Sequence, residues 1–278
     1  MKQLMLCLLV TTGILFSCSP KKDPLVHAWI INENAVDRKS LESITGPGLA
    51  PDGRFNSGNF MDLQADGTYS SYLPEYETGK WFFKDQMLIL VNKKKDMLEL
   101  QVNKVDEDEL VCTNKLKRTI YRFKGIPNSF VSKEENPFSL TNNLWRIKPL
   151  KRETDEQLRK RMKNHFTYWK QYFTMGLKNK VEVLDIGSTP SLFKMYGNGI
   201  QLEYYDNLFP EWKKCFYDSI DCRLAYENVY YKMYKNKIKW PDTKNRFESF
   251  VSAFTQLEQW MDEKTSPYVG SSGKQKKD

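Results

Sequence analysis

The sequence predicts a protein of two parts: an antiparallel β-barrel of eight short strands, followed by a smaller α+β domain with three amphipathic helices. Residues 25–126 consist of short apolar or alternating segments separated by tight turn signals, which is the pattern of successive β-strands. Residues 141–266 repeat apolar side chains every three or four positions, as amphipathic helices do. Residues 127–140 contain two prolines and several charges, and we expect them to form a linker.

The first residues of the chain have the organisation of an export signal. Lys2 provides a positive start, residues 4–16 form an apolar run, and Leu15-Phe16-Ser17-Cys18 places a small residue before a cysteine. The alternative, a transmembrane anchor, needs about 20 apolar residues, and this run is shorter. The segment resembles a bacterial lipoprotein signal. This resemblance implies a signal peptide at residues 1–17 and attachment of lipid, including palmitate, to Cys18.

A short polar tether at residues 18–24 follows the predicted signal. Because Ser19 comes directly after the cysteine, resemblance to lipoprotein sorting implies delivery to the outer membrane, and we expect the protein to face the periplasm. The membrane is therefore the first expected partner, through the lipid anchor on Cys18.

Eight strands are predicted before the linker. They cover residues 26–32, 56–64, 68–73, 79–84, 87–92, 97–103, 109–113 and 118–123. Asp66-Gly67 between two such segments is a strong hairpin signal. Eight antiparallel strands in sequence order can close into an up-and-down barrel, which removes exposed sheet edges.

Four segments of this half resemble a known group of domains. They are the surroundings of Trp29, the turn Asp66-Gly67-Thr68-Tyr69, the run Gly79-Lys80-Trp81 and the hairpin Asp108-Glu109-Leu110. Together they resemble the lipocalin-like domains of bacterial lipoproteins. The chain departs from that family at His27-Ala28-Trp29, where the family usually has glycine two residues before the tryptophan.

The predicted barrel offers candidate ligand-binding residues. An eight-stranded barrel can hold one small ligand or be filled by its own side chains. Trp29, Tyr69 and Trp81, with Tyr72 and Phe83 beside them in the sequence pattern, can line a pocket or form the core. We favour the core, because barrels of this size are often packed solid.

The second domain is predicted to begin with a strand at residues 144–147. A capping box of Thr154 and Gln157 marks the start of a first helix that ends at Gly176. Further strands are predicted at residues 181–186, 192–196 and 200–205, and a second helix at residues 212–234.

A third helix follows Pro241 and is predicted to be capped by Asp242 or Thr243. Its apolar stripe consists of Phe247, Phe250, Phe254, Leu257 and Met261. The stripe of the first helix consists of Leu158, Met162, His165, Trp169 and Tyr172. Residues 267–278 are rich in Gly, Ser and Lys, and we expect a disordered tail.

No residue pattern in the sequence indicates catalysis. His165 lies on an apolar helical stripe and is expected to be a core residue. No pair of cysteines has the spacing of zinc ligands, and we expect no cofactor and no metal. Cys215 and Cys222 are separated by two turns of the predicted second helix, so we expect them to be buried and not bridged. The net charge of +8 is distributed along an exported chain, so nucleic acid is not an expected partner.

Two functional hypotheses follow, and both describe a non-enzyme. In the first, the protein is a membrane-tethered interaction or scaffold protein of the envelope, and aromatic residues of the second domain contact a protein partner. Eight aromatic residues of this domain cannot all point inward on the predicted periodicities: Tyr204, Tyr205, Trp212, Tyr217, Tyr230, Tyr231, Tyr234 and Trp240. The alternative is that they cover the linker and the barrel wall in a contact between the two domains. In the second, the protein is a carrier that binds a small apolar ligand in the barrel. The sequence names neither ligand nor partner.

Overall fold

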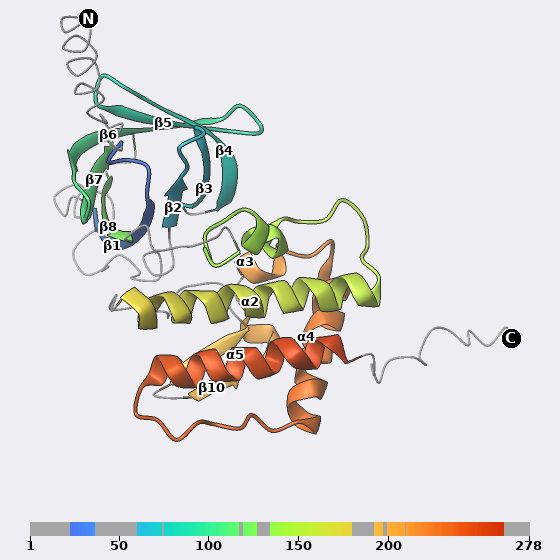
Figure 1. Cartoon of the computed structure of the whole chain (residues 1–278). Coiled ribbons are helices and arrows are strands. Elements are labelled where there is room, and N and C mark those ends of the chain that lie inside the picture. The colour runs from blue at the N-terminus through green and yellow to red at the C-terminus, as the bar shows by residue number, and fades with distance from the viewer. Residues whose placement is uncertain are drawn as a thin grey trace, which may run out of the picture.

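The computed structural model describes residues 23–36, 60–73, 75–116, 119–126, 134–179, 192–196, 199–208 and 210–263. It shows a closed eight-stranded barrel beside a separate helical region (Figure 1). The predicted signal peptide with Cys18, the predicted strand at residues 181–186 and the predicted tail lie outside the described residues.

The eight predicted strands are confirmed. They are β1 Ala28–Val36, β2 Phe60–Leu63, β3 Thr68–Tyr72, β4 Tyr76–Lys84, β5 Met87–Asn92, β6 Met97–Val105, β7 Glu109–Asn114 and β8 Thr119–Ile126. Each pairs antiparallel with the next in the sequence, and β1 also pairs with β8, which closes the barrel. Ala28 is opposite Asp62 on one side and Ile126 on the other.

Two glycines are required by the local geometry of the barrel. Gly67 in the β2–β3 turn has a φ of 74°, and the Asp66 carboxylate accepts a hydrogen bond of 2.9 Å from the backbone N–H of Thr68. Gly79 lies where β4 approaches β5 so closely that a Cβ atom would be 1.9 Å from the carbonyl oxygen of Val91. Any larger residue at position 79 would therefore push the two strands apart.

The interior of the barrel is filled by a cluster of buried side chains. Its members are Leu25, Trp29, Met61, Leu63, Tyr69, Leu88, Leu90, Leu100, Val102, Leu110, Cys112, Tyr121 and Phe123. They alternate along the strands with residues on the outer wall, as the two-residue repeat of a strand requires. Most are aliphatic, so this is largely a core of branched side chains.

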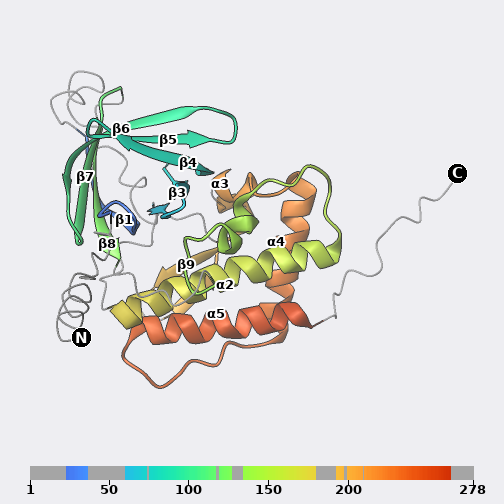
Figure 2. The same cartoon turned by 45° about the horizontal axis from the view of Figure 1, so that its top comes forward.

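Among the described residues, the helical region contains three long α-helices and one short one. They are α2 Asp155–Asn179, α3 Pro210–Lys213, α4 Ser219–Lys235 and α5 Arg246–Asp262. Its sheet, within the described residues, is the antiparallel pair β9 Phe193–Tyr196 and β10 Gly199–Leu202, which confirms the predicted hairpin. Figures 1 and 2 show α2 between the barrel and α5. None of the described helices combines the length and apolarity needed to span a membrane.

The predicted helical stripes are confirmed as core. All five stripe residues of α2 are buried, and so are four of the five on α5, with Phe247 partly buried. The capping box is confirmed as well: the backbone N–H of Thr154 donates to Gln157 Oε1 at 2.9 Å, and the N–H of Gln157 donates to Thr154 Oγ1 at 3.3 Å.

The strand predicted at residues 144–147 is wrong. Thr141–Arg146 instead forms a short 3-10 helix, η2. Trp145 and Arg146 are adjacent and both buried, whereas Leu144 and Ile147 are exposed, which the alternation of a strand does not allow. The Asn143 side chain stabilises this turn by donating to the carbonyl oxygens of Pro137 at 2.7 Å and Ser139 at 2.9 Å.

The single helix predicted at residues 212–234 is also wrong, because the chain turns between α3 and α4. Asp218 caps α4: its carboxylate accepts hydrogen bonds from the backbone N–H groups of Ile220 at 3.0 Å and Asp221 at 2.9 Å. Cys215 and Phe216 are buried in the turn. These buried residues continue the three- and four-residue spacing of apolar side chains from α3 into α4. This continuous spacing is why the sequence predicted a single helix.

Two helix ends also differ from their predictions. The N-cap of α5 is Asn245, whose side chain accepts a hydrogen bond of 2.9 Å from the N–H of Phe247, and not Asp242 or Thr243. Helix α2 continues past Gly176 to Asn179. A glycine in a helix lowers its stability without ending it when neighbouring turns are packed.

Part of the outer wall of the barrel belongs to the hydrophobic core of the helical region, whereas the barrel interior is a separate core. Ala28, Ile30, Phe60, Tyr72 and Ile126 on the outside of the barrel belong to the same buried cluster as the aromatic residues of α2. We call this contact the seam.

Residues predicted to be linker lie within the seam. Phe138 is fully buried, with its ring 4.6 Å from that of Phe60 on β2 and 6.2 Å from that of Tyr172 on α2. Arg146, on η2, is also buried, with its guanidinium over the rings of Tyr72 at 4.7 Å, Trp145 at 4.2 Å and Tyr168 at 4.8 Å.

Candidate functional site

The residues predicted to bind a ligand in the barrel are built into its wall and core. Trp29 is fully buried, and its Nε1–H donates to the carbonyl oxygen of Leu25 at 3.1 Å. Trp81 is partly buried, and its Nε1–H donates to the carbonyl oxygen of Gln64 at 2.9 Å. Tyr69 is buried, and burial raises the pKa of its phenol. These contacts fit the core alternative, and a ligand-binding role stays a prediction.

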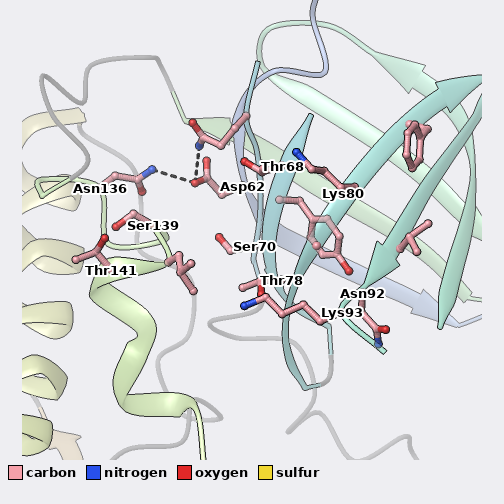
Figure 3. Close-up of a pocket in the computed structure, with 16 residues that line it drawn as sticks. Asp62, Thr68, Ser70, Thr78, Lys80, Asn92, Lys93, Asn136, Ser139 and Thr141 are labelled. Carbon is pink, nitrogen blue, oxygen red and sulfur yellow. Dashed lines mark hydrogen bonds between the residues drawn. The ribbon is translucent and has the colours of Figure 1, made fainter. Parts of the chain in front are cut away.

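A groove of about 660 Å³ lies outside the barrel, between its outer wall and the segment that leads into η2 (Figure 3). Its barrel side is formed by strands β2 to β5 and the turn after β5, and its other side by residues 136–141. This volume is within the range of about 300–1,000 Å³ typical of small-molecule sites.

The floor of the groove is a buried polar network that ties β2 and β3 to the segment before η2. Asp62 is buried, and its Oδ2 accepts hydrogen bonds from Gln64 Nε2 at 2.7 Å and Asn136 Nδ2 at 3.1 Å (Figure 3). Asn136 Oδ1 in turn accepts a hydrogen bond of 2.9 Å from the N–H of Phe138. Ser70 Oγ donates to the Phe138 carbonyl oxygen at 2.6 Å. The floor is therefore preformed.

The rim of the groove combines apolar side chains with positive charge. Phe82 is 55% exposed and Leu140 is 41% exposed, which leaves their apolar surface open to a ligand. Lys80 and Lys93 are also exposed on the barrel side, and neither forms an ion pair with any residue that the structure describes. The groove thus offers apolar contact and unpaired ammonium groups side by side.

Sequence reasoning did not predict this groove, although Tyr69, one of the three predicted ligand-binding residues, is among the residues that line it. Asp62 and Asn136, which meet at its floor, are 74 positions apart, and no motif links them. One signal for this contact was available in the sequence. The predicted linker contains Phe138 within Asn136-Pro137-Phe138-Ser139, and phenylalanine is a residue type that is usually buried.

The helical region carries a second candidate site, the aromatic face, which consists of Tyr205, Tyr226, Tyr230 and Tyr234. The rings of Tyr205 and Tyr226 are 5.4 Å apart, and those of Tyr226 and Tyr230 are stacked at 6.4 Å. Tyr230 is 56% exposed and Tyr234 is 79% exposed. The Arg223 guanidinium lies 4.8 Å from the Tyr205 ring.

The eight aromatic residues singled out in the second domain divide into three groups by exposure. Tyr204, Tyr217, Tyr230, Tyr234 and Trp240 are exposed, and Tyr205 and Tyr231 are partly buried. Trp212 is fully buried, 4.7 Å from the His165 ring, so it is not part of an exposed surface. The expectation that not all eight point inward is confirmed by the five exposed residues.

His165 has the environment of a core residue, as predicted. It is fully buried between the rings of Trp145 at 4.4 Å and Trp212 at 4.7 Å. Burial holds the pKa of its imidazole well below the ordinary value, and the nearby charge of Arg146 lowers it further. The imidazole is therefore neutral at physiological pH.

The three described cysteines are buried, and none of them forms a disulfide. The prediction that Cys215 and Cys222 are not bridged is confirmed, although they are not on one continuous helix as expected. Burial raises the pKa of Cys112 to about 12 and that of Cys222 to about 11, so both remain protonated thiols.

Within the described part of the chain, no group of three or more His, Cys, Asp or Glu side chains is placed to hold a metal ion. Comparison with known proteins finds no matching family model, no matching curated protein and no matching solved structure.

Proposed function

We propose that this protein is a non-catalytic interaction protein of the cell envelope, built on a lipocalin-like barrel and held at the outer membrane by a lipid on Cys18. The observation that carries the interaction function is the exposed aromatic face along α4. Tyrosine is enriched in protein interfaces because its ring buries a large area while its hydroxyl keeps a polar contact.

The contacts at the seam support this proposal. A set of exposed aromatic residues in a two-part protein can serve to join the two parts. Here, the parts are joined by other residues, among them Phe138 against Phe60 and Arg146 against Tyr72. Tyr230 and Tyr234 keep more than half of their surface open to solvent, so they remain available to a partner.

Photocrosslinking in intact cells tests the partner surface. A photoreactive amino acid at Tyr234 should capture one discrete protein in high yield. The same probe at Phe83, which is 45% exposed at the end of β4 of the barrel, is the matched control. The double variant Tyr230→Ser, Tyr234→Ser should reduce co-purification of the captured protein about tenfold or more, because central aromatic contacts dominate interface energies. Equal yields at positions 83 and 234 would contradict the proposal.

Cell fractionation tests the anchor. Cys18→Ala should move the protein from the membrane fraction to the soluble periplasmic fraction or leave the precursor uncleaved. Ser19→Ala changes the next residue, keeps the cysteine and should leave the protein in the membrane fraction. A Cys18→Ala variant that is processed normally and stays membrane-bound would show that Cys18 is not the attachment site.

A carrier function is the second candidate, and the groove beside the barrel favours it. The sequence predicted such a ligand inside the barrel, where Trp29 and Tyr69 pack in the core. The groove is the better-supported location, because its volume is open and its polar floor is preformed.

A further inference from the structure

We propose that the groove between the outer wall of the barrel and residues 136–141 binds a small anionic amphiphile, a free carboxylate with an unbranched apolar chain. The carboxylate is held at Lys93, and the chain lies along β4 toward Phe82. This proposal rests on the carrier function, the second candidate above, and is independent of the protein-interaction function and of the lipid anchor.

Strand register determines the order of groups along the barrel side of the groove. Gly79 is opposite Asn92, so Thr78 and Lys93 lie at one end of the β4–β5 pair. Lys80 is opposite Val91, and Phe82 is opposite Ile89, two residues farther along. Residues 78, 80 and 82 share one face of β4, because side chains alternate along a strand. The wall therefore runs from a charged and hydroxyl-bearing end to an apolar end.

The length of this row suits an extended chain of about ten carbons. Four residues of strand separate Thr78 from Phe82, which corresponds to about 13 Å. Leu140, on the other side of the groove, is 41% exposed and lines the same space. Covering Phe82, Val91 and Leu140 would remove apolar surface from water, and that is the driving force for the chain.

Charge determines the sign of the head group. Lys93 has no ion pair among the described residues, and Thr78 and Thr141, whose hydroxyls can donate hydrogen bonds, line the groove with it (Figure 3). A carboxylate at that end would gain charge-assisted hydrogen bonds. Lys80, in the middle of the row, would cover the chain with its aliphatic stem.

Asp62 excludes the anionic head from the β2 side of the groove. It lies on β2 opposite Ser70, which is opposite Thr78, so the register separates Asp62 from the Lys93 end by about three strand spacings, roughly 14 Å. The Asp62 carboxylate already accepts hydrogen bonds from two amides. The Asp62 carboxylate would repel an anionic head near it. A head at Lys93 is farther from that carboxylate than the screening length of roughly 8 Å.

Calorimetric titration with monomeric decanoate tests the proposal. The protein is the chain from residue 19 onward, which keeps every residue of the described fold and carries no lipid. Decanoate should bind with one site per chain. Lys93→Gln should weaken binding about tenfold, as expected for loss of a charge-assisted hydrogen bond. Lys94→Gln, a neighbouring exposed lysine of the same turn that does not line the groove, should change it less than about twofold.

The apolar end of the groove has its own test. Phe82→Ser should weaken decanoate binding about fivefold and leave the weaker binding of butyrate unchanged, because the shorter chain does not reach position 82. Circular dichroism checks that each variant is folded, and an exposed position such as Phe82 should tolerate the change.

Several results would overturn the proposal. One is equal loss of binding in Lys93→Gln and Lys94→Gln. A second is binding of decylammonium as tight as that of decanoate, since the head group would then not be selected by charge. A third is binding to phosphatidylglycerol vesicles without binding to monomeric decanoate, which would assign the surface to a membrane.

Discussion

The cores of the barrel and of the helical region bury tryptophan in different ways. In the barrel, both described indoles donate hydrogen bonds to backbone carbonyls, Trp29 to Leu25 and Trp81 to Gln64. In the helical region, the Nε1–H groups of Trp145, Trp169 and Trp212 are buried and have no hydrogen-bond partner among the described residues. The two parts therefore obtain stability from different sources.

The difference follows from how each core is built. A barrel places backbone carbonyls at the ends of its strands, within reach of an inward indole. The helical region packs aromatic rings against one another, for example Phe173 tilted against Phe250 at 4.8 Å and Trp169 stacked on Phe173 at 5.7 Å. Helix backbones hydrogen-bond internally, so they offer few free carbonyls to an indole. Ring packing must then offset the cost of the unpaired polar groups.

The largest effect is expected at the seam, where the two cores meet. Phe138→Ala removes a fully buried ring between Phe60 and Tyr172, and we expect a loss of about 3–5 kcal/mol in the free energy of unfolding. Urea unfolding measured by tryptophan fluorescence checks this value. Leu144→Ala, which truncates a 46% exposed side chain on η2, is the control and should cost less than about 1 kcal/mol. A small effect of Phe138→Ala would mean that the two cores are independent.

A matched pair of substitutions tests the comparison itself. Trp29 and Trp212 are both fully buried, so replacement of either by Phe removes a similar volume. Trp29→Phe also leaves the carbonyl of Leu25 without its donor, whereas Trp212→Phe removes a donor that had no partner. Trp29→Phe should therefore cost about 1–3 kcal/mol more than Trp212→Phe in the free energy of unfolding. Equal losses would remove the distinction between the two cores.

The smallest effect is a pH dependence of the helical region. The pKa of His165 is lowered in the folded protein, so between that pKa and about 6.5 the unfolded chain binds more protons than the folded one. The stability associated with neutral His165 is fully present above about pH 6.5 and is lost as the pH falls below it. The slope is at most about 1.4 kcal/mol per pH unit for one proton.

Urea unfolding of wild type and His165→Leu at pH 7.5, 6.0 and 5.0 measures this dependence. The variant should lose the part of the slope that comes from His165. If both proteins show the same slope through this range, another group causes the pH dependence. Asp218, whose pKa is lowered chiefly by its hydrogen bonds in the α4 cap, loses its contribution only at lower pH, as the pH falls below about 4.

Much of the fold was predictable because it depends on local patterns. The Asp66-Gly67 turn requires a residue that tolerates positive φ, and the alternation of Leu98, Leu100 and Val102 defines an inward face of a strand. The three- and four-residue spacing of apolar side chains along α2 and α5 likewise showed which face of each helix is buried. Closure of the barrel could also be predicted. Eight antiparallel strands in sequence order leave no unpaired edge strand when β1 pairs with β8.

The groove and the seam were decided only by tertiary structure. A periodic pattern shows which side of an element is apolar, but not what covers the opposite side. Phe60 and Tyr72 lie on the outer wall of the barrel, yet they are buried because residues from the predicted linker and α2 pack over them. Asp62 and Asn136 meet across 74 positions for the same reason. The sequence by itself determined the elements and their inward faces, and the packing of distant elements determined which outer faces became core, groove or open surface.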